Sequence, residues 1–323
     1  MDTTKKDYSI SFIRLVAMLC IFLCHLLQAY NNVLGGWFDV GVQIFFFLSG
    51  YLYGNKTIFD IKNFYIKNIF KILNPYYIFI TLILVTLYLF GKMPTINDIE
   101  NTLILKCSIP GTQHLWFIRF ILVCYLFIPI FQKILNLFEN FNKRYFLLYL
   151  FLIALLIELI FSGIIKITGA WFVCYFSGMA YSKIEEKNLL NKSILIFIFF
   201  GAAFLSFIRI YAYYNLDLSY YIYRYIWCYQ HIFFGVTIFI FARYIYTKMQ
   251  NIVNLKKILS ISDKYSYHFY IVHYSLIVGY FSIIPIVSNK ILSCISIFVC
   301  TCVFSLVLYF LSHKNFEYLG RLK

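Results

Sequence analysis

Charged residues are scarce in this sequence, and acidic residues are the scarcest. Only 13% of the 323 residues are charged, and 13 acidic side chains stand against 28 lysines and arginines. Hydrophobic residues make up 62% of the chain, which is more than one water-soluble core of this size can bury. A soluble fold is therefore excluded, and the composition predicts an all-α, polytopic bundle of membrane helices.

The sequence also lacks the cysteine spacings of metal sites and disulfide frameworks. Its nine cysteines include no CxxC pair, and eight of them lie in apolar runs, where cysteine packs as a small hydrophobic residue. We therefore expect no disulfide framework and no metal site. Cys107 alone falls in a polar segment, so we expect it to be reachable from water. No small-residue cleavage site follows the first apolar run, so we expect no signal peptide.

Ten apolar runs each have the length of a membrane helix, which needs about 20 residues. We expect about ten transmembrane helices that form a single integral-membrane domain over residues 1–323, with no appended soluble domain. The expected spans are 10–29, 38–54, 73–91, 116–136, 144–162, 164–182, 193–212, 224–245, 266–287 and 291–312.

The distribution of basic residues predicts the orientation of these helices. With the N-terminus in the cytoplasm, twenty of the 28 basic residues fall in cytoplasmic segments and seven in outer loops or outer helix ends. Cytoplasmic loops of membrane proteins collect lysine and arginine, so both termini are expected to be cytoplasmic. The polar segment 92–115 is then outside, and it is long enough to fold over the helices. The same asymmetry explains the net charge of +15 without a nucleic acid partner.

The first apolar run carries two ionisable residues, Arg14 and His25. Such groups are costly in a membrane helix and usually face a cavity. Eleven residues turn a helix by about 20° beyond three full turns and advance it by about 16 Å, so both side chains share one face. Arg14 alone fits an interfacial anchor, and His25 alone fits a packed histidine. Together they favour a polar channel.

Two further segments could hold phosphates or pack helices closely. In the second run, Ser49 and Gly50 provide a small site for close helix approach. The basic stretch from Lys62 to Lys71 follows, and its lysines could bind phosphate as point charges. Ordinary enrichment of lysine on the cytoplasmic side is the alternative for this stretch.

Two more segments carry histidine. His114 and Trp116 begin the fourth run, where His114 could contact a substrate and Trp116 could stack on a sugar ring. An interfacial aromatic belt explains Trp116 equally well. His273 lies about two turns into the ninth run, where it could instead be a packed structural histidine.

Taken in order, these segments resemble the motifs of acyltransferase family 3, whose membrane proteins O-acylate surface polysaccharides. Two features depart from that family: Gln43 replaces a frequent acidic residue, and lysines replace frequent arginines in the basic stretch. The esterase-like soluble domain of some relatives is also missing. The matching features are R-x10-H at Arg14 and His25, FFxLSG at Phe45–Gly50, HLWF at His114–Phe117, and S-x3-Y-x2-H at Ser266, Tyr270 and His273.

The resemblance implies an acyl-CoA-dependent O-acetyltransferase. It would move an acyl group from cytoplasmic acyl-CoA, with acetyl-CoA as the expected donor, to a hydroxyl of a cell-surface or lipid-linked polysaccharide such as capsule or exopolysaccharide. His25 would act as general base or carry the acyl group transiently. Asp39 would orient His25 or simply cap a helix. The remaining expected site residues are Arg14, Lys67 and Lys71 for the CoA phosphates, and His114, Trp116 and His273 for the substrate.

We expect acyl-CoA as a co-substrate and no permanently bound cofactor. The expected location is the bacterial plasma membrane, with membrane lipids, a surface glycan or lipid-linked oligosaccharide, and separate glycan-assembly proteins as partners. A transporter or flippase of glycan precursors is the main alternative, although the sequence shows no two related halves. A non-catalytic sensor or scaffold is the other.

Overall fold

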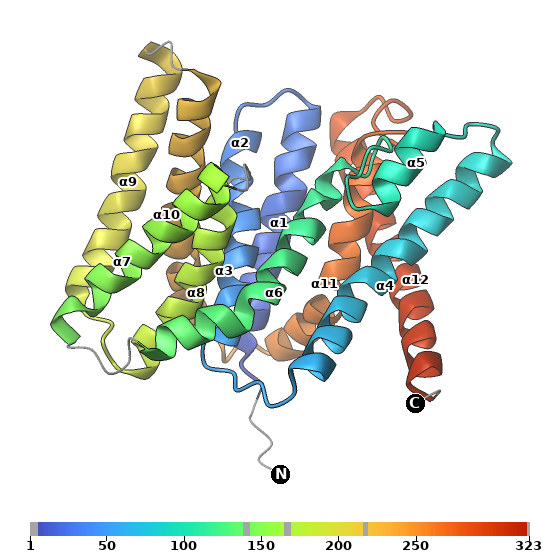
Figure 1. Cartoon of the computed structure of the whole chain (residues 1–323). Helices are drawn as coiled ribbons and strands as arrows, with labels where there is room; N and C mark the ends of the chain where they lie inside the picture. Colours follow the sequence, from blue (N-terminus) through green and yellow to red (C-terminus); the bar gives the residue numbers. More distant parts are fainter. Residues whose placement is uncertain (1–5, 138–142, 165–168, 216–218, 322–323) are drawn as a thin grey trace. The chain divides into compact units, whose positions relative to one another are not determined.

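The computed structural model describes residues 6–137, 143–164, 169–215 and 219–321. The structure is all-helical in these ranges, with 82% helix and no strands. Figure 1 shows the helices, which are α1 (Tyr8–Ala29), α2 (Gly35–Phe38), α3 (Val40–Gly54), α4 (Ile61–Leu89), α5 (Ile96–Leu103), η1 (Gln113–Leu115), α6 (Trp116–Leu137), α7 (Lys143–Leu159), η3 (Ile160–Ile164), α8 (Ala170–Glu186), α9 (Lys192–Asn215), α10 (Tyr220–Met249), α11 (Leu255–Ile277) and α12 (Lys290–Arg321).

Helices of membrane-spanning length and composition account for much of the chain. Within the described ranges, six are long and apolar enough to cross a membrane, which confirms the all-α class with several apolar helices. The count of about ten spans and the side on which the termini lie remain predictions. The six are Tyr8–Ala29, Ile61–Leu89, Gln113–Leu137, Lys192–Asn215, Ile222–Met249 and Lys290–Lys314.

The start of α4 and both ends of α11, which begins at Leu255, lie ten residues or more from the predicted boundaries. Helix α4 begins at Ile61 and not near residue 73, because the Asp60 carboxylate caps it by accepting a hydrogen bond from the Asn63 amide at 2.9 Å. The basic stretch is therefore helical. Helix α11 ends at Ile277 and not at 287. The chain turns at Gly279, whose φ of +98° is a conformation that a side chain would disfavour.

The described chain divides into two compact units. Unit 1 comprises Met1–Ala17, Asp39–Ile58 and Cys124–Lys256, and therefore contains α3 and α7–α10. Unit 2 comprises Met18–Phe38, Phe59–Val123 and Lys257–Lys323, and contains α4, α5 and α12.

Unit 1 is built on a backbone contact between α3 and α8. A Cβ added at Gly50 would lie 1.9 Å from the Tyr175 carbonyl oxygen, and one added at Gly178 would lie 2.0 Å from the Phe47 carbonyl oxygen. Only hydrogen fits at either position. The prediction that Gly50 allows close helix approach is confirmed, and Gly178 is the partner that the sequence did not reveal. The Phe47 ring then packs edge-on against Phe239 of α10 at 4.9 Å.

In unit 2 the polar segment 92–115 packs against two helices. The Tyr76 hydroxyl of α4 donates a hydrogen bond to the Thr102 carbonyl at 2.5 Å. A Cβ at Gly279, just beyond α11, would lie 2.6 Å from the Pro110 carbonyl oxygen. The segment thus runs back along α4 to the level of Tyr76 and then meets the end of α11, and Figure 1 shows α5 beside α4.

The expectation that Cys107 is accessible to water is wrong. Its side chain is only 2% exposed, and its sulfur lies 3.9 Å from the Tyr76 hydroxyl oxygen. Burial also raises the pKa of the Cys107 thiol to about 11. Because the thiolate is the reactive form, Cys107 stays protonated and unreactive near neutral pH.

The orientation of the chain is therefore testable with introduced cysteines. We expect Glu100→Cys, which lies on the exposed surface of α5, to react with an impermeant maleimide in intact cells. Glu186→Cys, at the end of α8 where the side chain is 56% exposed, should react only after the cells are opened. The measurement is labelling above that of the unsubstituted protein. The reverse pattern would mean that the predicted orientation is inverted.

Candidate functional site

Three histidine rings meet in unit 2. His25 comes from α1, His114 from η1 and His273 from α11. The ring centroids lie 5.4 Å apart for His25 and His273, 5.0 Å for His114 and His273, and 6.2 Å for His25 and His114. The structure therefore brings together three residues that are more than 240 positions apart at the extremes of the sequence. We call them the histidine cluster.

Tyrosines of α11 complete the histidine cluster. The Tyr274 ring lies 4.6 Å from the ring of His25 and 4.9 Å from that of His114. Sequence reasoning missed Tyr274, although its position one turn after Tyr270 places it on the same side of the helix. The Tyr270 hydroxyl donates a 2.5 Å hydrogen bond to the His114 carbonyl, so the tyrosine of the S-x3-Y-x2-H signature positions η1.

Backbone carbonyls determine which ring nitrogen carries the proton in His114 and His273. His114 Nε2 lies 2.9 Å from the Tyr270 carbonyl oxygen and 3.1 Å from that of Ile271. Because carbonyls only accept hydrogen bonds, Nε2 must carry the proton, which leaves the lone pair of a neutral His114 on Nδ1. His273 Nδ1 lies 2.7 Å from the Tyr270 carbonyl oxygen, so its lone pair is on Nε2.

The remaining ring nitrogens are buried and unpartnered. His25 Nδ1, His114 Nδ1 and His273 Nε2 have no hydrogen-bond partner among the described residues. Gln28, one turn after His25, hydrogen-bonds the His25 ring through its side chain. Each buried polar atom without a partner costs about 1–3 kcal/mol. Three such nitrogens in one cluster indicate a site where polar atoms of a substrate can supply the missing hydrogen bonds.

The residues expected to bind phosphate lie on two helices. Arg14 is half-buried on α1, in the part of that helix that belongs to unit 1. Its guanidinium interacts electrostatically with the Tyr125 side chain. Helix α1 is continuous from Tyr8 to Ala29, so the predicted spacing of Arg14 and His25 along one helix holds. Lys67 and Lys71 are exposed on α4, in unit 2.

Asp39 and Trp116, two further predicted site residues, interact with residues outside the histidine cluster. Asp39 stands at the N-cap of α3 but makes no side-chain capping bond, and its carboxylate interacts electrostatically with Arg209 within unit 1. Arg209 in turn donates a 3.0 Å hydrogen bond to the Gln230 side chain. Trp116 is half-buried, and its ring packs edge-on against Phe120 at 5.5 Å.

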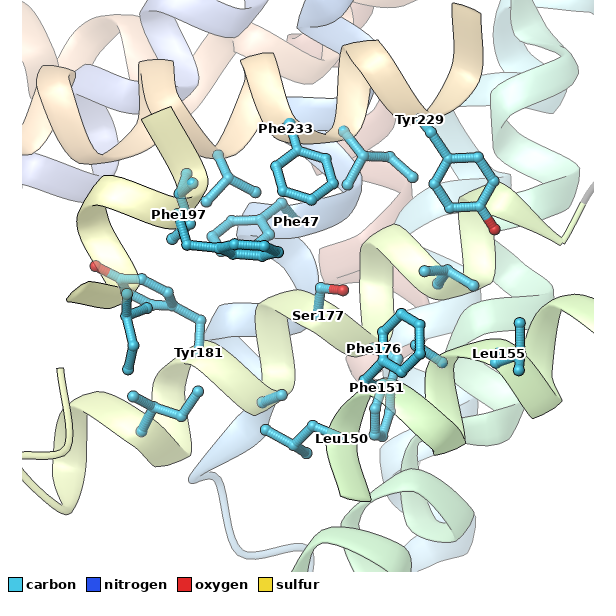
Figure 2. Close-up of a pocket in the computed structure, with 18 residues that line it drawn as sticks. Phe47, Leu150, Phe151, Leu155, Phe176, Ser177, Tyr181, Phe197, Tyr229 and Phe233 are labelled. Atoms are coloured by element: carbon cyan, nitrogen blue, oxygen red, sulfur yellow. The ribbon is translucent and has the colours of Figure 1, made fainter. Parts of the chain in front are cut away.

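Unit 1 contains an apolar groove of about 390 Å³. Figure 2 shows Phe47, Phe197 and Phe233 along one side of it and the Ser177 hydroxyl in its middle. No lysine, arginine, aspartate or glutamate lines the groove. The groove therefore suits hydrocarbon and offers no charged side chain to a polar ligand.

Several helices that are long and apolar enough to cross a membrane, with ionisable histidines buried among them, are typical of a membrane protein with a polar interior site. Comparison with known families gives the identification: the acyltransferase domain model of acyltransferase family 3 matches residues 7–311, and the chain belongs to this family. It is thus a multi-pass membrane acyltransferase. No curated protein and no solved structure matches the chain.

Proposed function

We propose that the protein transfers an acetyl group from cytoplasmic acetyl-CoA to a hydroxyl of a cell-surface or lipid-linked polysaccharide in the bacterial plasma membrane. The supporting observation is the histidine cluster, in which each of three neighbouring rings has one buried nitrogen without a partner in the described parts of the chain. Neutral imidazole is the usual general base near pH 7. An acyltransferase needs such a base, because a sugar hydroxyl must lose its proton to attack a thioester.

In the proposed step, His25 takes the proton of the acceptor hydroxyl as its oxygen attacks the thioester carbonyl carbon. The new C–O bond forms, the C–S bond breaks, and the CoA thiolate receives the proton from the imidazolium. His114 and His273 lie at 6.2 Å and 5.4 Å from His25 by ring centroid, close enough to contact the same reacting groups. Trp116 is proposed to stack on the acceptor sugar at the start of α6.

Arg14, with Lys67 and Lys71, is proposed to hold the CoA phosphates. The eleven residues from Arg14 to His25 span about 16 Å along the continuous helix α1, a length that an extended pantetheine arm can bridge. Asp39 is proposed to orient His25, and Arg209 is the nearby positive charge that acts on its carboxylate within unit 1.

Replacing Arg14 with alanine is expected to weaken acetyl-CoA binding by about tenfold or more, because a charge-assisted hydrogen bond is worth about 1.5–3 kcal/mol. Lys67→Ala should have a smaller effect, since Lys67 is one exposed charge in a cluster. The measurement is acetyl-CoA affinity of detergent-purified protein at fixed salt. Unchanged affinity in well-folded Arg14→Ala protein would reduce Arg14 to an interfacial anchor.

The proposal as a whole is tested by incubating purified protein with acetyl-CoA and the isolated glycan. Release of free CoA together with glycan acetylation supports the transferase. Glycan-precursor transport in vesicles without thioester loss would indicate a flippase, and neither activity would indicate a sensor or scaffold. In cells, the acyl content of the surface glycan should fall when the gene is deleted.

A further inference from the structure

A polar pocket in unit 2 lies apart from the histidine cluster, and among its lining residues only Lys71 has a part in the proposed function. It has a volume of about 270 Å³ and lies among three helices. Its lining residues are Lys71, Asn74 and Pro75 of α4, His268 of α11, and Tyr309, Ser312 and His313 of α12.

The pocket carries only basic and neutral groups. Lys71 and His313 are exposed at its rim, and none of the seven lining residues is acidic. Lys264 adds a further positive charge nearby, because its ammonium nitrogen lies 4.7 Å from the centroid of the Tyr309 ring. Because the lining includes basic side chains and no acidic ones, the pocket attracts anions.

The inner wall of the pocket is held in place by hydrogen bonds. His268 is only 8% exposed, and its Nε2 lies 2.9 Å from the Ser312 hydroxyl oxygen. Asn74 donates a 2.9 Å hydrogen bond to the Ser312 carbonyl and so ties α4 to α12. The other nitrogen of His268, Nδ1, is buried and has no partner within the described ranges. These hydrogen bonds hold the wall in place, and His268 Nδ1 is available to hydrogen-bond a ligand.

We propose that this pocket binds a phosphate group. Phosphate oxygens accept hydrogen bonds from ammonium and imidazole N–H groups, and Lys71 of α4 and His313 of α12 supply such donors. Two molecules could bring the phosphate: an anionic phospholipid, or acyl-CoA if the proposed function holds. Ser312 and His313 lie at the end of the candidate membrane span Lys290–Lys314, where headgroups would lie. Basic pockets between membrane helices at that level bind anionic lipid headgroups.

Distance along α11 favours the lipid. His268 precedes His273 by five residues, which corresponds to about 7.5 Å of helix. This is half of the roughly 16 Å that separates Arg14 from His25 along α1. An acyl-CoA whose phosphate reached His268 at the inner wall, and not only Lys71 at the rim, would have to fold its arm to bring the thioester to the histidine cluster, whereas a phospholipid meets no such constraint.

The test uses the purified full-length protein and the variants Lys71→Ala and His313→Ala. Both side chains are exposed, so these changes should leave the fold intact. Lys257→Ala is the matched control, because Lys257 is an exposed lysine of α11 that does not line the pocket. One arm measures the thermal stabilisation by phosphatidylglycerol over phosphatidylcholine in mixed micelles. The other measures the affinity for acetyl-CoA over acetyl-dephospho-CoA.

We expect the phosphatidylglycerol concentration for half-maximal stabilisation to rise about tenfold or more in both pocket variants and to stay unchanged in Lys257→Ala. A loss of the preference for acetyl-CoA over its dephospho form in the same variants would also support the phosphate site and assign it to CoA. If both pocket variants keep both preferences, the proposal is overturned. The phosphatidylglycerol measurement requires no acyl-CoA. A protein that fails to bind acetyl-CoA would therefore contradict the proposed function, while the lipid measurement would still test whether the pocket binds phosphate.

Discussion

Replacing His25 with alanine is expected to lower acetyl transfer by roughly 10²–10⁴-fold, the usual contribution of a general base, while acetyl-CoA affinity is retained. The reason is geometric. His25 joins the histidine cluster from α1 with its Nδ1 buried and unpartnered within the described chain, and its ring lies 4.6 Å from that of Tyr274. In the proposed function, an unpartnered nitrogen of this ring takes the proton of the acceptor hydroxyl. The measurement is transfer per folded molecule, with folding confirmed by size exclusion.

Two other histidines serve as controls for His25→Ala. His231 is a fully buried histidine of unit 1 whose Nδ1 lies 2.9 Å from the Trp227 carbonyl oxygen. Its replacement by alanine should lower stability and yield but leave turnover per folded molecule intact. His114→Ala should weaken use of the acceptor more than the chemical step if His114 is a substrate contact. It also removes the Nε2 bonds to the carbonyls of Tyr270 and Ile271, so stability must be measured alongside.

A double variant tests whether the histidines act together. If His25 and His114 serve one reacting centre, the combined loss in His25→Ala/His114→Ala should be smaller than the product of the single losses, because residues that act as a unit are strongly non-additive. Near-normal turnover in well-folded His25→Ala protein would rule out His25 as the base.

The class of fold follows from composition, because a chain with so little charge has few ways to satisfy its backbone outside a helical bundle. Apolar runs locate helices well, but they do not locate helix ends. Helix α4 extends twelve residues before the expected start of its span, since Asp60 supplies a cap that hydropathy does not register. Helix α11 ends ten residues early, because the close approach of Gly279 to Pro110 is a tertiary contact.

The candidate site was predictable in its residue types but not in its geometry. Motif resemblance selected His25, His114 and His273, yet nothing in the sequence indicates that their rings meet. Their convergence depends on Tyr270, which bonds the His114 carbonyl and accepts through its own carbonyl from both His114 and His273. The burial of Cys107 could not be predicted from the sequence either. A polar segment can be buried when its backbone groups hydrogen-bond to neighbours, as the Thr102 carbonyl does with Tyr76.

The contact between α3 and α8 gives the largest expected effect on folding. Gly50→Ala would add a methyl group 1.9 Å from a backbone oxygen of Tyr175. Backbone cannot move aside as a flexible side chain can, so the two helices must separate and lose the packing around Phe47. Overpacking a core costs about 1–3 kcal/mol and occasionally more. This cost outweighs the gain of up to about 1 kcal/mol that alanine brings to a helix interior. Gly178→Ala meets the Phe47 carbonyl at 2.0 Å and should behave alike.

The matched control for both variants is Gly163→Ala, because a Cβ at Gly163 has no atom within 4 Å. It makes the same chemical change without a clash. We expect a lower melting temperature and a smaller monodisperse fraction in detergent for Gly50→Ala and Gly178→Ala, and neither change for Gly163→Ala. The double variant Gly50→Ala/Gly178→Ala should cost less than the sum of the two single variants, since one separation of the helices relieves both clashes. If Gly50→Ala were as stable as Gly163→Ala, the backbone contact could not be what holds unit 1 together, and the FFxLSG run would need another explanation.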